Sequence, residues 1–383
     1  GDPAAAETAQ GACFAPRIDI RQRSLTILGI NRTYLPPLAA AGAHARRRNM
    51  APRATQAAAA LLLAAQAAGV GGFKAIVTGA SGMVGSTLLH QLEFTTEGCE
   101  KATAVRRRTH GDLSTDEGAA ALADTARDTG AAVIHCAATF AGEDIVDRNV
   151  RAAQAAVRAA AAAGGRLVFL SSMAAVRGPG QEPRPEVGFF TADDWNESTD
   201  LSTVGAQYQA SKAQSEREAW RLAKELGVEM VSLCPSMIFG PPEDIGRCME
   251  SFSAKRVSQW MDGERPIETR LAVDVRDVVD ACIASVTTPE AAGRRYIISD
   301  EKRVPAEEVA KKMRKLTFDT ALEFDGAYVP PVPLGSKEVD SAPVVSELQL
   351  APLRDGLDSI MAMAEAVLIE EERDAARRLY GVA

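Results

Sequence analysis

The chain has 383 residues, of which a quarter are charged, so it is long enough for one large or two modest domains of ordinary globular composition. Its net charge of -8 argues against nucleic acid as a partner. The six cysteines include no CxxC pair and the four histidines lie far apart, so the sequence indicates neither a metal site nor a disulfide framework. A reducing compartment is therefore expected.

Residues 1–72 differ from the rest of the chain. Eight arginines and one acid lie within residues 17–53, and a run of mostly Ala and Leu follows at 57–69, too short to span a bilayer as a helix. An Arg-rich, acid-poor leader is typical of a plastid or mitochondrial transit peptide, and a basic stretch before a short apolar run is also typical of a signal sequence. Met50 is a candidate internal start. An unstructured tail on a cytoplasmic protein is the alternative.

From residue 73 onward, β-like and helical patterns alternate. Strands are predicted at 73–78, 101–106, 131–137, 166–172 and 229–235, and helices at 83–92, 149–163 and 208–226. Strands that alternate with helices imply right-handed βαβ units and a doubly wound parallel sheet. The sequence therefore predicts an α/β, Rossmann-type domain over residues 73–240.

This alternation breaks in two regions. Residues 177–204 are rich in Gly, Pro and acids, which predicts a long loop of the kind that often carries function. Residues 241–383 mix loops, helices and short strands, and end in one or two helices after residue 346. We expect them to form mainly a smaller substrate lobe over the carboxyl edge of the sheet.

Three glycines follow the first predicted strand at the start of a helix. Gly79, Gly82 and Gly85 have the spacing G-x-x-G-x-x-G. A sharp turn without side chains lets the backbone approach a pyrophosphate, and the helix N-terminus offers it free N–H groups and the positive end of the helix dipole. The pattern predicts a dinucleotide site, although a glycine turn by itself is common.

The end of the second strand indicates which dinucleotide is bound. An acid there would bind the ribose hydroxyls of NAD(H), but this chain has Arg106 and Arg107, whose guanidinium groups suit a 2′-phosphate. NADP(H) is therefore favoured over NAD(H). Asp112 is a candidate contact to the adenine. The alternative is that the arginines form a solvated basic edge.

Tyr208 and Lys212 lie one helical turn apart and share a helix face. A nearby ammonium is expected to lower the pKa of the phenol, so that Tyr208 could donate a proton to a carbonyl oxygen. Lys212 is also a candidate cofactor contact, as a hydrogen-bond donor to the ribose. Ser172, at a strand end, could hold the same oxygen. Asn149 is expected at a helix start that supports a water near Lys212. Each of these four residues also has an ordinary structural reading, such as a surface pair, a strand end or a helix cap.

Together the motifs resemble the extended short-chain dehydrogenase/reductase superfamily, and within it the branch of dihydroflavonol, cinnamoyl-CoA and NADPH-dependent aldehyde or methylglyoxal reductases. The likeness covers about residues 73–370. It is carried by Val77-Thr-Gly-Ala-Ser-Gly-Met-Val-Gly85, Val133-Ile-His-Cys-Ala-Ala138, Val168-Phe-Leu-Ser-Ser172, Tyr208-Gln-Ala-Ser-Lys212 and Pro235-Ser-Met-Ile-Phe-Gly-Pro241. The resemblance implies a triad of Ser172, Tyr208 and Lys212 with Asn149 in support. It implies cofactor contacts from Gly79, Ser81, Gly82, Met83, Arg106, Ala137, Ala138, Pro235 and Met237.

One departure from the branch concerns the adenine side. Only a few residues separate Arg108 from Gly111, where the family usually has a helix and a third strand. We therefore expect the third strand to be short or absent.

The function indicated is reduction of a small aldehyde or ketone, or an acyl-CoA ester, by NADPH. Phe189, Phe190, Trp195, Met237 and Phe239 form either an apolar substrate surface or ordinary core. The alternatives are a sugar-nucleotide epimerase or dehydratase on the same fold, and a non-catalytic NADP(H)-binding subunit of a larger assembly. The sequence does not set the oligomeric state.

Overall fold

The computed structural model describes residues 72–380, so the predicted leader lies outside the described residues except for Gly72. Residues up to Arg373 belong to one compact unit, and residues 374–380 are described only as the end of the last helix. Among the helices of the described residues, none combines the length and apolar character of a membrane span.

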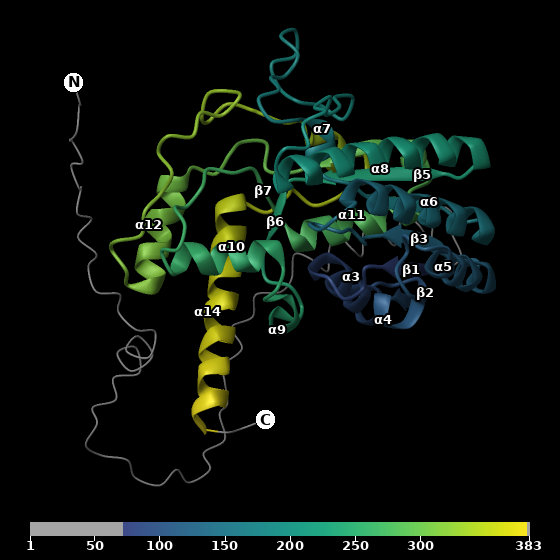
Figure 1. Cartoon of the computed structure of the whole chain (residues 1–383), viewed down its shortest axis with the longest axis horizontal. Coiled ribbons are helices and arrows are strands. Elements are labelled where there is room, and N and C mark those ends of the chain that lie inside the picture. The colour runs from purple at the N-terminus through teal and green to yellow at the C-terminus, as the bar shows by residue number, and fades with distance from the viewer. Residues whose placement is uncertain (1–71, 381–383) are drawn as a thin grey trace, which may run out of the picture. The chain divides into compact units, whose positions relative to one another are not determined.

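A sheet of six parallel strands forms the centre of this unit (Figure 1). In spatial order the strands are β2 (Cys99–Val105), β1 (Phe73–Thr78), β3 (Ala132–His135), β4 (Leu167–Leu170), β5 (Met230–Pro235) and β8 (Arg295–Ile298). The chain runs from β1 to β2 on one side and then crosses to β3 on the other side. The predicted doubly wound α/β fold is confirmed. In such sheets, ligands bind where the strand order reverses, at the carboxyl ends of the strands.

Helices cover both faces of the sheet. On one face Ile76 and Val133 pack under helices α5 (Asp116–Thr129), α6 (Ile145–Ala163) and α8 (Val204–Leu226). On the other face Val77 and Ile134 pack under α3 (Met83–Phe94) and α11 (Val275–Thr287). Because both faces of each central strand are buried, these strands are apolar at successive residues, which explains the apolar runs in the sequence.

The additional strand that was expected to be short or absent between β2 and α5 is absent, in agreement with the short spacing. The segment holds only the short helix α4 (Arg107–His110), after which α5 leads to β3. β2 is therefore an edge strand whose hydrogen-bonded neighbour in the sheet is β1.

The region after residue 240 divides between the sheet and a lobe, which differs from the expectation of mainly lobe. α11 packs on the sheet, and β8 extends it by pairing with β5. The sequence did not predict β8 as a strand of the sheet, because a run of four residues is too short for a clear pattern. The lobe contains paired strands β6 (Met237–Phe239) and β7 (Ala272–Asp274) and helices α9 (Ile245–Cys248), α10 (Phe252–Met261), α12 (Ala306–Thr317) and α14 (Gly356–Tyr380). Phe239, Trp260 and Met363 lie in its apolar core. The short elements α7 (Met173–Val176), η1 (Pro289–Ala291) and α13 (Ala342–Glu347) complete the fold.

Two helices that carry candidate site residues begin four residues earlier than predicted. α8 starts at Val204 because the Thr203 hydroxyl caps it, accepting a hydrogen bond from the N–H of Ala206 at 3.0 Å. α6 starts at Ile145, so Asn149 lies inside the helix rather than at its start. Asn149 is therefore not a helix cap.

Candidate active site

The glycine turn lies between β1 and α3 and packs tightly against the end of β3. Gly79 has φ +68°, and a Cβ there would lie 2.7 Å from the backbone nitrogen of Ala137. A Cβ on Gly85 would lie 2.3 Å from the Gly79 carbonyl oxygen. At Gly82 the nearest atom would be 3.4 Å away. The fold itself therefore requires glycine at positions 79 and 85, whereas Gly82 keeps the space above the turn open.

The N-terminus of α3 suits a phosphate group. Gly82 caps the helix without a side-chain hydrogen bond, and the first turn contains no acid. Ser81 is exposed on the turn, and Met83 is half-buried as the first helical residue. Free N–H groups at a helix N-terminus bind anions. These residues therefore fit a dinucleotide pyrophosphate.

Arg106 and Arg107 occupy different environments at the end of β2. Arg106 is half-buried and lines a cavity of about 480 Å³ together with Ala80 of the glycine turn. Arg107 is 67% exposed and lies 3.4 Å from the carboxylate of Asp112. The structure thus brings Arg106, rather than Arg107, to the glycine turn.

The Asp112 carboxylate is held by neighbouring residues. It accepts hydrogen bonds from the backbone and hydroxyl of Ser114, at 3.0 and 2.8 Å, and from Arg148 at 2.7 Å. Partial burial acts to raise the pKa of Asp112, but these hydrogen bonds outweigh it and bring the pKa to about 2. Asp112 therefore serves at least to tie α6 to the segment after β2.

The ends of β3 and β5 provide the other predicted cofactor positions. The N–H of Ala137 donates to the Thr78 hydroxyl at 3.3 Å, and Ala138 follows in the same half-buried loop. Pro235 ends β5 and is buried, and Met237 begins β6 and is half-buried. All four residues follow or end strands at the carboxyl edge of the sheet, and their contact with a cofactor stays a prediction.

Ser172 and Tyr208 meet at this edge. The Ser172 hydroxyl accepts a hydrogen bond from the N–H of Ala174 at 3.1 Å, as the N-cap of α7. Its own O–H is therefore left to point elsewhere. Burial raises the pKa of the Tyr208 phenol to about 12, while a hydrogen bond with the Ser172 side chain acts to lower it. The phenol thus remains a neutral proton donor at ordinary pH.

The expected lowering of the Tyr208 pKa by Lys212 is not found. Desolvation dominates at the phenol, and Lys212 is not among the groups that act on it. The Lys212 ammonium instead donates to the carbonyl oxygen of Leu170 at 2.9 Å. Its own pKa falls to about 8 because of burial, which the charge of Glu216 partly opposes.

Asn149 fastens the loop after β3 to α8. Its side-chain oxygen accepts from the N–H of Thr139 at 2.8 Å, and its amide donates to the Thr139 carbonyl at 2.9 Å. The amide also donates to the hydroxyl of Ser211 at 3.0 Å. Asn149 therefore holds two parts of the candidate site together, through its side chain rather than through a helix start.

Two features of the site were not anticipated. Phe140, 56% exposed, stacks on the Tyr208 ring with centroids 5.3 Å apart. Glu216 extends the Tyr208–Lys212 face of α8 by one more turn and is fully buried; the four-residue spacing was a signal for it. Of the two alternatives for Phe190 and Phe239, substrate surface or ordinary core, the structure supports core, because both side chains are fully buried.

Within residues 72–380, no three His, Cys, Asp or Glu side chains cluster in a way that would hold a metal ion.

A profile of the "NAD dependent epimerase/dehydratase family" matches residues 75–299. The chain belongs to this family. The matched residues run from β1 to the end of the sheet and include the glycine turn, Ser172, Tyr208 and Lys212.

Curated relatives of the chain are reductases of plants. Cinnamoyl-CoA reductase 1 of Arabidopsis thaliana is 31% identical over 166 residues, which are 42% of this chain and 46% of that protein. Tetraketide alpha-pyrone reductase 2 of the same plant is 28% identical over 129 residues, 34% of this chain and 40% of the relative. The matched part thus spans about half the length of these relatives.

Solved structures share the fold. Yeast methylglyoxal/isovaleraldehyde reductase Gre2, complexed with NADPH, has a TM-score of 0.64 and 20% identity, covering 79% of this chain and all of that one. UDP-glucuronic acid 4-epimerase from Bacillus cereus, in complex with UDP-glucuronic acid and NAD, has a TM-score of 0.57 and 17% identity. The match covers 78% of this chain and 100% of the epimerase chain.

Proposed function

We propose that the protein is a reductase that uses NADPH to reduce an aldehyde, a ketone or an acyl-CoA ester. The observation that carries this proposal is the meeting of Ser172 and Tyr208 at the carboxyl edge of the sheet. Lys212 lies one turn from Tyr208 on α8 and is hydrogen-bonded to the Leu170 carbonyl of β4. A nicotinamide dinucleotide, when bound, supplies a hydride. The residues of the chain then have to bind the carbonyl oxygen and protonate it.

The phenol and the serine divide this work. The Ser172 O–H, whose oxygen is already occupied by the N–H of Ala174, donates to the substrate oxygen. The Tyr208 O–H transfers its proton to that oxygen as negative charge develops there. A phenol pKa of about 12 keeps this proton in place until the carbonyl is reduced. Lys212, held by the Leu170 carbonyl one helical turn from Tyr208, would donate a hydrogen bond to the ribose of the cofactor.

NADP(H) is the proposed cofactor because of Arg106. The guanidinium has no ion-pair partner among the described residues and shares a cavity with the glycine turn. A 2′-phosphate would give this guanidinium a negatively charged partner. The NADPH complex of the structurally similar yeast reductase and the cinnamoyl-CoA reductases among the relatives support the same choice.

Epimerase or dehydratase chemistry is the second enzymatic candidate, since the family includes both. Dehydratases of this fold usually have an acid pair beside the strand-end hydroxyl, whereas this chain continues from Ser172 to Met173 and Ala174. This difference favours the reductase over the dehydratase.

The test is NADPH oxidation, followed at 340 nm, against aldehydes, ketones and acyl-CoA esters, with NADH in parallel. We expect turnover with at least one class, and a loss of about 100-fold or more in Tyr208→Phe. NADPH binding without turnover across the panel would instead support a non-catalytic subunit, and conversion of a UDP-sugar with NAD retained would support an epimerase.

A further inference from the structure

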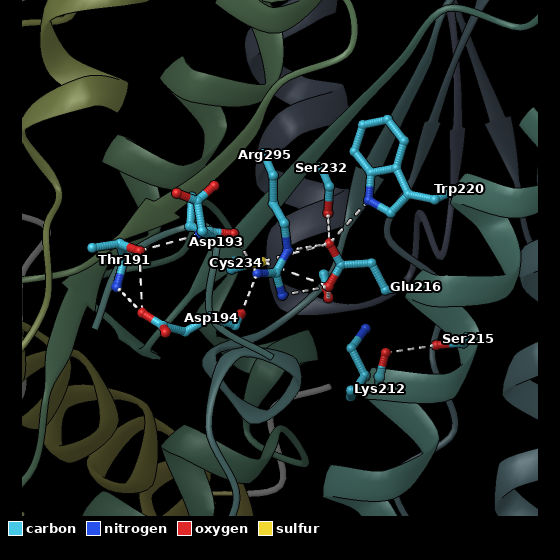
Figure 2. A network of polar contacts seen from close by, with 12 residues as sticks. Thr191, Asp193, Asp194, Lys212, Ser215, Glu216, Trp220, Ser232, Cys234 and Arg295 are labelled. Carbon is cyan, nitrogen blue, oxygen red and sulfur yellow. Dashed lines mark hydrogen bonds and ion pairs between the residues drawn. The ribbon is translucent and has the colours of Figure 1, made fainter. Parts of the chain in front are cut away.

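A buried ion pair, formed by Glu216 and Arg295, lies close to Lys212 (Figure 2). Glu216 on α8 is fully buried, and the side chain of Arg295 at the start of β8 is 8% exposed. The Arg295 guanidinium donates to both carboxylate oxygens, at 2.7 Å through Nε and 3.1 Å through Nη2. The two residues are 79 positions apart, so the pair forms only when α8 packs over the far edge of the sheet.

The Glu216 carboxylate is saturated with donors. Its Oε2 accepts from the Ser171 hydroxyl at 2.6 Å, and its Oε1 accepts from Ser232 at 2.6 Å and from the Trp220 indole at 3.4 Å. Burial acts to raise the pKa of Glu216, but Arg295 and the hydroxyls outweigh it and lower the pKa. The group is therefore a fixed negative charge, and it is bonded to the residue next to Ser172.

This fixed charge acts on Lys212, one helical turn away. Burial lowers the pKa of Lys212 and Glu216 opposes that effect. The other titratable groups that face the ammonium are Cys234 on β5, His135 at the end of β3 and Cys136 directly after β3. His135 is neutral at ordinary pH, because burial and Lys212 bring its pKa to about 3. Among these groups, Glu216 contributes most to raising the pKa of Lys212 and so favours its protonated form.

The other end of the pair holds the 177–204 loop. Nη1 of Arg295 donates to the backbone carbonyls of Ala192 and Asp194, at 2.7 and 2.6 Å. Its guanidinium carbon lies 3.9 Å from the centre of the Trp195 ring. The next residue, Asn196, bonds to the backbone carbonyls of α7, the helix that begins after Ser172. Displacement of Arg295 would therefore release the loop at the edge of the site.

We infer that Glu216 and Arg295 are positioning residues for the proposed reduction. Glu216 fixes the Ser171 side chain and favours the charged form of Lys212. Arg295 fixes residues 192–196 at the edge of the proposed substrate site. The inference rests on the proposed function for its kinetic consequences. A merely structural ion pair would change the stability of the fold but not the titration of Lys212 or the division of effects between kcat and KM.

The two roles are separated by two single variants. Glu216→Gln keeps the shape and removes the charge, so the pKa of Lys212 should fall by about one pH unit or more. The alkaline limb of the kcat profile should move to lower pH by a similar amount, with kcat lowered about 10- to 100-fold. Arg295→Lys keeps the charge but loses the two bonds to the loop, so KM for the carbonyl should rise roughly tenfold with the Lys212 titration unchanged.

Glu216→Gln leaves a buried guanidinium without its partner and can fail to fold. The double variant Glu216→Gln/Arg295→Gln removes both charges and supplies the second test. It should fold and still show the lowered Lys212 pKa and the lowered kcat. A matched control is Arg166→Gln/Glu229→Gln, which removes an ion pair that precedes β4 and β5 at the opposite edge of the sheet. Its kcat and pH profile should equal those of the wild type.

The Lys212 titration is measured by NMR on protein labelled at the lysine ε-carbon, with the signal assigned by Lys212→Arg. This readout needs no turnover. An unchanged Lys212 titration together with unchanged kcat and KM in the double variant would overturn the inference. Absence of wild-type turnover on every carbonyl would overturn the proposed function, and the titration would then judge the effect of Glu216 on Lys212 separately.

Discussion

The ammonium of Lys212 donates a hydrogen bond to the backbone carbonyl of Leu170, at 2.9 Å, and its side chain is almost fully buried. A helix side chain is thereby fastened to the strand that ends at the candidate serine pair. Burial at this point costs stability, because it brings the pKa of Lys212 down to about 8. The position is therefore better explained by function than by stability.

Lys212→Met should stabilise the protein while it abolishes turnover. The folded pKa lies below that of the unfolded chain, so the unfolded state binds more protons between about pH 8 and 10.5 and wild-type stability rises with pH across that window. At pH 7 the wild type bears the full free-energy cost of burying the charged Lys212, so Lys212→Met should be more stable by roughly 1–3 kcal/mol. Urea denaturation of both proteins at pH 7 and pH 10 measures it. A variant less stable than wild type at pH 7 would show that Lys212 is a structural residue.

His135 should make the fold sensitive to acid. Its ring bonds to the Thr78 hydroxyl at 2.9 Å, and burial and the charge of Lys212 lower its pKa to about 3. Between about pH 3 and 6.5 the unfolded chain binds the extra proton, so stability is lost as pH falls through this window, by about 1.4 kcal/mol per pH unit. In His135→Gln the slope of unfolding free energy against pH should be smaller by one proton. An identical slope contradicts this assignment.

The glycine turn offers a matched pair of substitutions. In Gly82→Ala the new Cβ meets no atom of the protein closer than 3.4 Å, so the unfolding temperature should stay close to that of the wild type. NADPH affinity should nevertheless drop, because the methyl group occupies the approach of the pyrophosphate. In Gly85→Ala the Cβ would overlap the Gly79 carbonyl, so the fold should lose about 1–3 kcal/mol. Calorimetry and fluorescence titration with NADPH separate the two effects.

Arg106 should determine cofactor preference. Arg106→Ala is expected to weaken NADPH binding by about 10- to 100-fold, the scale of a charge-assisted hydrogen-bonded pair, with NADH binding unchanged. Arg108→Ala serves as the control, since that side chain is exposed on α4. Titration of each variant with both cofactors checks the preference. An equal loss for NADPH and NADH would mean that Arg106 shapes the turn and does not bind a phosphate.

The sequence predicted the parts of the fold and site that depend on local patterns. The glycine turn, the Tyr208–Lys212 face and Ser172 are each encoded within a few residues, and the structure places them at one edge of the sheet. Glu216 and Arg295 could not be paired in advance, because 79 residues separate them and the helical spacing that marks Glu216 does not indicate its partner. The Tyr208 pKa was predicted in the wrong direction because desolvation depends on packing around the phenol, which residue spacing does not report.

The most direct test of the central claim is the rate of hydride transfer in a single turnover, with NADPH preloaded and the best carbonyl substrate added. Tyr208→Phe should transfer hydride about 100-fold more slowly than wild type or more, while its affinity for NADPH is retained. Tyr296→Phe, whose hydroxyl binds Glu347 on α13, should match wild type. A Tyr208→Phe rate equal to that of Tyr296→Phe would show that the proton comes from another group.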